Sequence, residues 1–424
     1  MLVEPIDLYI QGLKIFRSDV VGRITLKGIT ILIGGRGSGK STVLEALRFL
    51  GKTAWLVSKH QELSNRCVDD GCCLKYECYE LLTQPEPSNT PIPEFFNKFQ
   101  AANSVVVALS DSIRNIVWGV EILRDETAGK KCPYKIHEFE NDDKHTKEIF
   151  SKLETSLDRA KINAESVPLV HVASSLRTRY MKPRESTAER SGLEDVLVNG
   201  IGTHGEYLYD LIEYADYIIP PIGFEHIPVI WRHYKDLAEK LISKVPDLPE
   251  RAVTKIGRCY DGRLCVTEET TSGERYNILF DMLSFGSRNL LVILVELAVA
   301  KYVLENTDKK VIIGFEEPEI ALHSSTLTAL TELMTELVIE NQNRLYIVIT
   351  THSPKILLPL LTILKEQGRN KTDVLGVYHL LRVGMIGSEI HEVNIGEIPV
   401  RLTPLAKPYL SLHELRMLEK LIEG

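Results

Sequence analysis

The chain has 424 residues, which is long enough for two or three domains around a sizeable hydrophobic core. Hydrophobic residues make up 44% of it and charged residues 25%, a globular composition that excludes a mainly disordered chain. The formal net charge of −8 argues against a uniformly basic nucleic-acid binder, although it permits a local basic patch.

Neither a membrane segment nor a signal peptide is expected. The longest apolar run, Leu290–Leu304, contains Glu296 and Lys301 and is too short to cross a bilayer. The first ten residues contain Glu4 and Asp7 and lack the basic start of a signal peptide. We therefore expect a cytoplasmic protein.

The N-terminal part is predicted to consist of strands and one helix. Branched apolar residues are frequent in Leu8–Phe16 and Gly22–Ile33, which predicts strands. A glycine-rich turn follows, and apolar residues at helical spacing predict a helix over Ser41–Leu50. Short alternating segments from Cys72 to about Glu140 then predict an antiparallel β meander.

The middle of the chain reads as mainly helical, and the C-terminal part as alternating helix and strand. Helices are predicted over 144–164, 193–218 and 227–245, with a short strand over 169–173. A hairpin is predicted to turn at Asp261-Gly262. Beyond it come a helix over 287–306, a strand over 311–315, a helix over 324–341 and a strand over 345–350. Such alternation predicts a parallel sheet with both faces covered.

The most specific motif lies between a predicted strand and a predicted helix. It consists of Gly34, Gly35, Arg36, Gly37, Ser38, Gly39, Lys40, Ser41 and Thr42 and fits G-x-x-x-x-G-K-[ST], the P-loop. The glycines allow backbone N–H groups to surround a polyphosphate, and the helix N-terminus adds its positive dipole end. We expect Lys40 to reach the β and γ phosphates of ATP and the Ser41 hydroxyl to bind Mg²⁺.

A second motif delivers adjacent carboxylates at the end of the apolar strand 311–315. Ligands of parallel sheets bind beyond such strand ends, so these acids are predicted to face the P-loop. Glu316 is the candidate Mg²⁺ residue, and Glu317 is the candidate that polarises the attacking water. The alternative is a solvated acidic turn after a buried strand.

Two weaker motifs complete the set. His352 follows the apolar strand 345–350 and is a candidate to contact the γ phosphate or the attacking water, although such a histidine is more often a surface or capping residue. Ser284, Gly286 and Arg288 precede or open a predicted helix, which fits an anion site, although an ordinary serine N-cap is the commoner explanation of such a pattern.

In this order the four motifs resemble the ATP-binding-cassette (ABC) ATPases, and more closely the branch that includes RecF, SMC heads and OLD-family nucleases. The resemblance covers residues 6–115 and 276–354. It implies an α/β P-loop NTPase fold in three segments: an ATPase lobe with an antiparallel β meander (1–140), a mainly helical insertion (141–250) and a second, parallel-sheet lobe (251–424). Residues 170–177 and 202–206 are similar to OLD-related ATPases, and no Toprim nuclease domain is expected. Glu316 stands where the family usually has aspartate.

The resemblance also implies a function. ATP and Mg²⁺ would join two copies of the chain, with Ser284, Gly286 and Arg288 of one closing over the phosphates held by the other. Lys40, Glu317 and His352 would carry hydrolysis. The setting it implies is DNA repair, chromosome maintenance or defence against mobile elements, with DNA as a partner. The alternative is an ATP-gated regulatory or scaffold subunit that controls a separately encoded effector protein without binding DNA.

Three further features stay open at the level of the sequence. Residues 177–190 carry a local charge of +3, from five basic and two acidic side chains, which fits a DNA contact or a solvated loop equally well. A second group consists of Cys67, Cys72, Cys73 and Cys78, whose spacing lacks the pairs of zinc sites and favours free thiols. Cys259 and Cys265 would lie opposite one another if the hairpin loop has three residues, but we do not predict a disulfide there.

Overall fold

The computed structural model describes half of the first predicted lobe, most of the second and little of the segment between them. Its described residues are 5–51, 104–111, 116–123, 134–140, 168–173, 200, 208, 211, 226–245, 253–259, 264–269, 275–352, 354–366, 374–384 and 387–394. The predicted helix over 144–164, the basic segment 177–190, residues 202–206 and the four-cysteine cluster lie outside this set.

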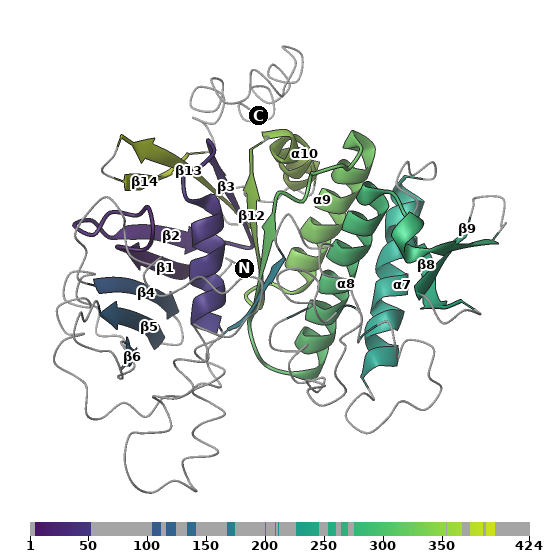
Figure 1. Cartoon of the computed structure of the whole chain (residues 1–424), viewed down its shortest axis with the longest axis horizontal. Helices are drawn as coiled ribbons and strands as arrows, with labels where there is room; N and C mark the ends of the chain where they lie inside the picture. The colour runs from purple at the N-terminus through teal and green to yellow at the C-terminus, as the bar shows by residue number, and fades with distance from the viewer. Residues whose placement is uncertain are drawn as a thin grey trace, which may run out of the picture.

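A six-stranded sheet lies at the centre of the molecule (Figure 1). In spatial order its strands are β14 (Gly387–Glu392), β13 (Leu375–Val383), β3 (Ile29–Gly34), β12 (Leu345–Thr351), β11 (Val311–Glu316) and β7 (Leu169–Ala173). All neighbours are parallel except β13 and β14. The apolar runs of β3, β12 and β11 are buried along almost their whole length, as a sheet covered on both faces requires. The predicted α/β fold is therefore confirmed, and the strands bearing the motifs end at one edge.

Helices cover the central sheet on both sides (Figure 1). The helix after the P-loop, residues 40–51, lies on the side of the second sheet. On the other side lie α8 (Phe285–Asn306), α9 (Ser324–Glu340) and α10 (Leu357–Glu366), with α7 (Ile227–Lys244) packed on α8. The helix over 40–51 packs closely on the sheet. A Cβ added at Gly314 of β11 would lie only 2.9 Å from Leu44 Cδ2 of this helix.

A five-stranded antiparallel sheet forms the adjoining layer and confirms the predicted meander from residue 104 onward, while residues 72–103 lie outside the described part of the chain. Its order is β2 (Gly22–Leu26), β1 (Ile6–Gln11), β4 (Ser104–Asp111), β5 (Ile116–Leu123) and β6 (Tyr134–Glu140). The inward side chains of β1, such as Leu8 and Ile10, are fully buried. This layer therefore supports the N-terminal strands that lead to the P-loop.

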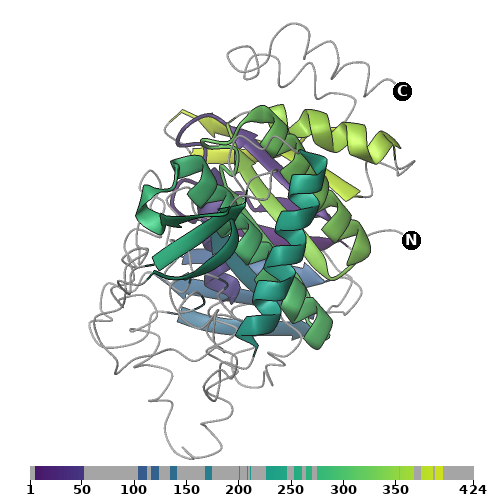
Figure 2. The ribbon, with the colours of Figure 1, turned by 90° about the vertical axis from the view of Figure 1, so that its right-hand side faces the viewer.

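A small antiparallel sheet precedes α8 (Figure 2). It consists of β10 (Arg275–Leu279), β9 (Leu264–Glu269) and β8 (Val253–Arg258). The predicted hairpin is confirmed in its two strands, while its turn lies outside the described residues. Cys259 and Cys265, which we did not expect to pair, form a disulfide with their Cα atoms 5.4 Å apart. In the sheet, Cys265 of β9 lies opposite Leu279 of β10. Leu279 is the residue just before the 3₁₀ helix η3 (Phe280–Met282), which leads into α8.

Within the described residues, no helix combines the length and hydrophobicity needed to cross a membrane. The same part of the chain contains no group of three or more His, Cys, Asp or Glu side chains placed to hold a metal ion.

A buried ion pair joins α8 to the edge strand of the central sheet. His171 Nδ1 on β7 lies 2.7 Å from Glu296 Oε1 on α8, and both side chains are at most 1% exposed. Removing the imidazole leaves the Glu296 side chain buried without this partner. We expect His171→Leu to lower the free energy of unfolding by about 1–3 kcal/mol, measured by chemical denaturation.

The matched control is the partly exposed pair of His391 and Glu389 on β14. There the same substitution, His391→Leu, should cost no more than about 1 kcal/mol. Equal losses in the two variants would contradict the role assigned to burial.

Candidate functional site

The P-loop residues wrap the space between β3 and the helix that follows. Gly37 and Gly39 have φ angles of +70° and +100°, which favour glycine over residues with a Cβ. A Cβ at Gly34 would meet Leu380 O and Ser38 Oγ at 2.5 Å each, so this backbone can pass only without a side chain. Residues 35–37 are exposed and Ser38 is buried. The loop is therefore a glycine-dependent cradle that opens to solvent at the start of a helix, as an anion site requires.

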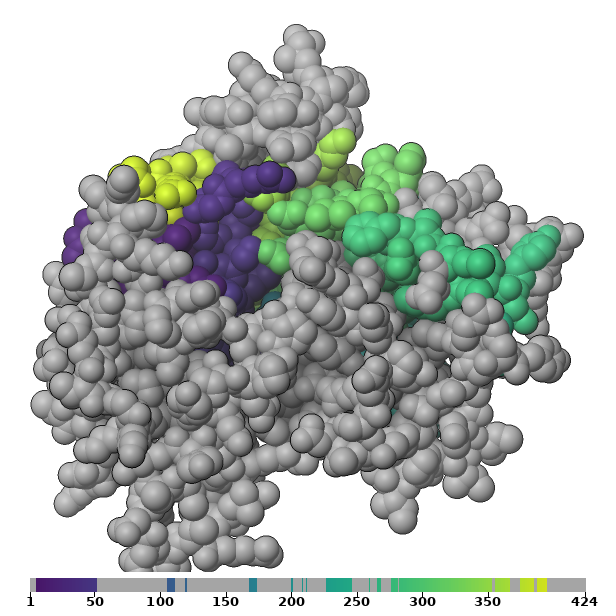
Figure 3. Space-filling model, in the orientation of Figure 1, coloured from purple at the N-terminus to yellow at the C-terminus, as the bar shows by residue number. Residues whose placement is uncertain are grey.

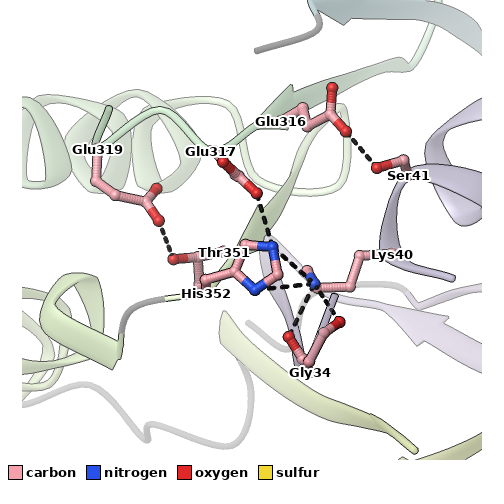
Figure 4. A network of polar contacts seen from close by, with 9 residues as sticks. Gly34, Lys40, Ser41, Glu316, Glu317, Glu319, Thr351 and His352 are labelled. Carbon is pink, nitrogen blue, oxygen red and sulfur yellow. Dashed lines mark hydrogen bonds and ion pairs between the residues drawn. The ribbon is translucent and has the colours of Figure 1, made fainter. Parts of the chain in front are cut away.

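Lys40 points back into this cradle (Figure 4). Its Nζ donates to Gly34 O at 2.8 Å and to Gly35 O at 3.1 Å, and the residue is only 5% exposed. Burial lowers the pKa of Lys40 to about 8, against the opposing effect of Glu317, Glu316 and Glu319. The buried ammonium of Lys40 therefore lies where a phosphate bound by the loop would stabilise its charge.

Ser41 and Glu316 meet across the site. The Ser41 hydroxyl donates to Glu316 Oε1, although the two residues come from the helix after the P-loop and from the end of β11. A hydroxyl and a carboxylate are oxygen ligands of the kind Mg²⁺ takes, and Mg²⁺ usually needs only one or two protein groups because water and phosphate complete its shell. The predicted pair therefore fits a Mg²⁺ ion bound together with a nucleotide.

Glu317 and His352 form the second contact across the strand ends. His352 Nε2 lies 2.9 Å from Glu317 Oε1, and each side chain is about a quarter exposed. Burial and then the charge of Lys40 lower the pKa of His352 below its usual value, although Glu317 opposes this effect. Nδ1 and Nε2 of the imidazole also lie 3.4 Å and 3.3 Å from Lys40 Nζ, so His352 contacts both the P-loop lysine and Glu317.

The carboxylates follow β11 in a turn whose backbone is unusual. Glu317 has a φ of +48° and Ala321 a φ of +60°, and neither is glycine. The turn is tied to β12 by two hydrogen bonds, from Glu317 N to Thr350 O at 2.8 Å and from the Thr351 hydroxyl to Glu319 Oε1. Figure 4 shows these side chains converging from the ends of β11 and β12. The structure thus brings the P-loop, both predicted carboxylates and His352 into one site.

The N-terminal end of α8 is capped by a side chain of its own. Ser284 is the N-cap, and its Oγ accepts from Ser287 N at 3.0 Å and lies 2.9 Å from Ser287 Oγ. The helix starts at Phe285, two residues earlier than predicted, because this cap closes the first turn there. Met282 and Phe285 are 73% and 40% exposed. Of the predicted residues, Ser284 is therefore exposed at this helix end, Arg288 is partly buried and Gly286 is buried.

Sequence reasoning missed three contributors to the site. Thr351 and Glu319 lie inside the quoted motifs, but their hydrogen bond joins two strands that are distant in sequence. Arg382 lies on β13, and its Nη1 is 3.4 Å from the place that a Cβ at Gly37 would occupy. The only signal for Arg382 was a cation near the end of the apolar run 375–383.

Comparison with known proteins gives one family match. A family described as "AAA ATPase domain" matches residues 225–357, a range that contains Ser284, the carboxylate turn and His352. This part of the chain is therefore similar to an ATPase domain. No curated protein matches the chain significantly.

Three solved structures are among those that the chain resembles. An Smc head domain from Pyrococcus furiosus with an extended coiled coil, bound to the C-terminal domain of ScpA, has 13% identity and a TM-score of 0.49 over 95% of this chain and 99% of that one. The SMC head domain from Thermotoga maritima has 13% identity and a TM-score of 0.40, over 93% and 100%. The recombination mediator protein RecF of the RecFOR pathway has 10% identity and a TM-score of 0.41, over 93% and 100%. Values this low establish neither an activity nor a partner for the present chain.

Figure 3 shows that the N-terminal residues, in purple, and the green residues of the second predicted lobe meet on one face of the molecule. Residues of both predicted lobes therefore lie on this face, and the hydrogen bond between Ser41 and Glu316 joins the same two lobes.

Proposed function

We propose that the chain is an ABC-type ATPase that binds and hydrolyses ATP and acts as an ATP-driven dimerising switch. The observation that carries the proposal is the meeting of two sets of groups. Lys40 and Ser41 come from the P-loop, and Glu316, Glu317 and His352 come from the ends of β11 and β12. A phosphate cradle beside an acidic pair is the arrangement that phosphoryl transfer to water needs, since catalysis there is mostly positioning and charge stabilisation.

Each residue then has a specific task. The backbone N–H groups of residues 34–42 and the ammonium of Lys40 bind the phosphates of ATP. Ser41 and Glu316 hold Mg²⁺, which when bound neutralises phosphate charge. Glu317 accepts the proton of the attacking water, because its carboxylate lies at the open side of the site and is oriented by His352.

The exposed end of α8 completes the site of a second copy of the chain. Ser284, Gly286 and Arg288 belong to a helix N-terminus, whose dipole favours an anion, and the side-chain hydrogen bonds of Ser284 stay within that helix end. Exposed Met282 and Phe285 on either side of Ser284 supply apolar area for a contact. Two copies arranged head to head would place this end over the partner's phosphates.

The setting of the switch follows from the motif resemblance to the RecF, SMC and OLD branch. That resemblance favours DNA repair, chromosome maintenance or defence against mobile elements in the cytoplasm. It is an association from motifs and fold, and the site chemistry itself supports only ATP binding and hydrolysis.

The dimer is tested by mixing two inactive variants. Lys40→Ala removes phosphate binding from its own site, and Ser284→Arg blocks the helix end that serves the partner. Each alone should be inactive, whereas a mixed pair retains one intact site and should regain ATP turnover. A mixture that stays inactive, with no increase in mass on adding ATP to the wild type, would contradict a site completed by a second copy.

The response of ATP turnover to DNA distinguishes action on chromosomes from the alternative, a regulatory subunit that controls an effector protein. ATP turnover that rises with DNA and loses this response steeply with salt favours action on chromosomes. Turnover indifferent to DNA, with stable co-purification of a separately encoded effector, favours the regulatory subunit instead.

A further inference from the structure

We propose that Asn289 is a positioning residue that couples the exposed end of α8 to the carboxylate turn of the same chain. The inference rests on the proposed function, and it assigns a route by which the contact with one partner regulates the other site. In the dimer, the α8 end of a chain serves the partner's ATP, whereas its carboxylate turn serves its own ATP. A link between them connects the two sites.

The link is a pair of hydrogen bonds from one buried amide. Asn289 lies near the start of α8 and is 2% exposed. Its Nδ2 donates to Pro318 O at 3.3 Å and to Ile320 O at 2.8 Å. Both acceptors belong to the turn that begins with Glu317, so the side chain of Asn289 bridges the helix and the turn.

The turn needs such support because its backbone is strained. Positive φ angles at non-glycine residues cost on the order of 1–3 kcal/mol each and persist only where the surroundings enforce them. Glu317 and Ala321 both have such angles. From the side of the sheet, Thr350 and Thr351 hold the turn. From the side of α8, Asn289 holds it, and the position of the Glu317 carboxylate therefore depends on where α8 lies.

The other end of the link is the segment expected to meet the partner. Ser284 caps the same helix. The backbone hydrogen bond from Arg288 N to Ser284 O, 3.0 Å long, makes the cap and the first turn one rigid unit. A small shift of this unit on contact with the partner's phosphates moves Asn289 with it. Because packed elements move as rigid bodies rather than deform continuously, the shift reaches the carboxylate turn.

Asn289→Ala tests the role of the amide in steady-state ATP hydrolysis. Removing both donors should lower kcat at least about tenfold, since small misplacements of catalytic groups cost up to about 100-fold. KM should stay within about twofold, because the P-loop is unchanged and the lost contact acts only in turnover. Hydrogen exchange in residues 316–322 should become faster.

Thr335→Val is the matched control. It also removes a buried hydrogen bond, from Thr335 Oγ1 to Thr331 O at 2.7 Å within α9. It should leave kcat and the exchange of residues 316–322 unchanged, whatever its effect on thermal stability. Should Asn289→Ala fail to fold, Asn289→Ser retains a shorter hydroxyl and should lower kcat by a smaller factor.

A double-mutant cycle with Ser284→Ala tests the coupling itself. If Asn289 transmits the contact, Ser284→Ala should lower kcat less in the Asn289→Ala background than in the wild type. Additive effects, or wild-type kcat in folded Asn289→Ala, would overturn the inference while leaving the ATPase intact. A wild type that hydrolyses no more ATP than Lys40→Ala would instead overturn the proposed function, and the coupling with it.

Discussion

Glu317→Gln is expected to hydrolyse ATP at least about 100-fold more slowly than the wild type, the lower end of what a positioned general base contributes. The amide keeps the size of the side chain and can still accept from His352 Nε2, now 2.9 Å from Glu317 Oε1. It cannot accept a proton from water. KM for ATP should change little, because the P-loop, Lys40 and Ser41 remain. ATP should therefore hold the variant as a dimer, visible as a doubled mass that ADP does not produce.

The control is Glu319→Gln, the same chemical change in the same turn. Glu319 Oε1 accepts from the Thr351 hydroxyl, a bond that an amide oxygen retains. This variant should keep kcat within about tenfold of the wild type, because Glu317, which accepts the proton of the attacking water, is still present. A wild-type rate in Glu317→Gln would remove the catalytic assignment, and equal losses in both variants would assign the effect to the charge of the turn.

Local patterns in the sequence predicted the parts of the site that come from single segments. The P-loop needs glycines at fixed positions, and the strand before it and the helix after it are visible from apolar spacing. The acidic pair was predictable because a run of apolar residues ends at Glu316, and such runs form buried parallel strands. Strand ends at one edge of a sheet then place Glu317 and His352 near the cradle.

The contacts that join distant segments were not predictable. Asn289 reads as an ordinary residue near a helix start, and only the packing of α8 shows that its amide reaches Pro318 O and Ile320 O. Arg382 lies beside Gly37 because β13 pairs with β3, and neither β13 nor β14 was predicted. The pairing of Cys259 with Cys265 likewise depended on a register that the sequence left open.

Lys40→Ala is expected to weaken ATP binding about 100-fold, which corresponds to about 3 kcal/mol, the upper end for a hydrogen bond to a charged group. The reason is the burial of the ammonium. Its Nζ is held by two carbonyl oxygens, and its pKa is lowered to about 8 by burial, so it is poorly compensated until a phosphate arrives. Binding should be measured with a fluorescent ATP analogue, and turnover should be lost along with it.

An exposed lysine provides the comparison for this loss. Lys365 lies at the end of α10 on the surface, and Lys365→Ala changes the net charge of the protein by the same amount. It should bind ATP as the wild type does, because a solvated charge outside the site is screened by salt. If both variants bind ATP equally well, Lys40 takes no part in holding the phosphates. The glycine-dependent loop around Lys40 would then bind a ligand other than a triphosphate.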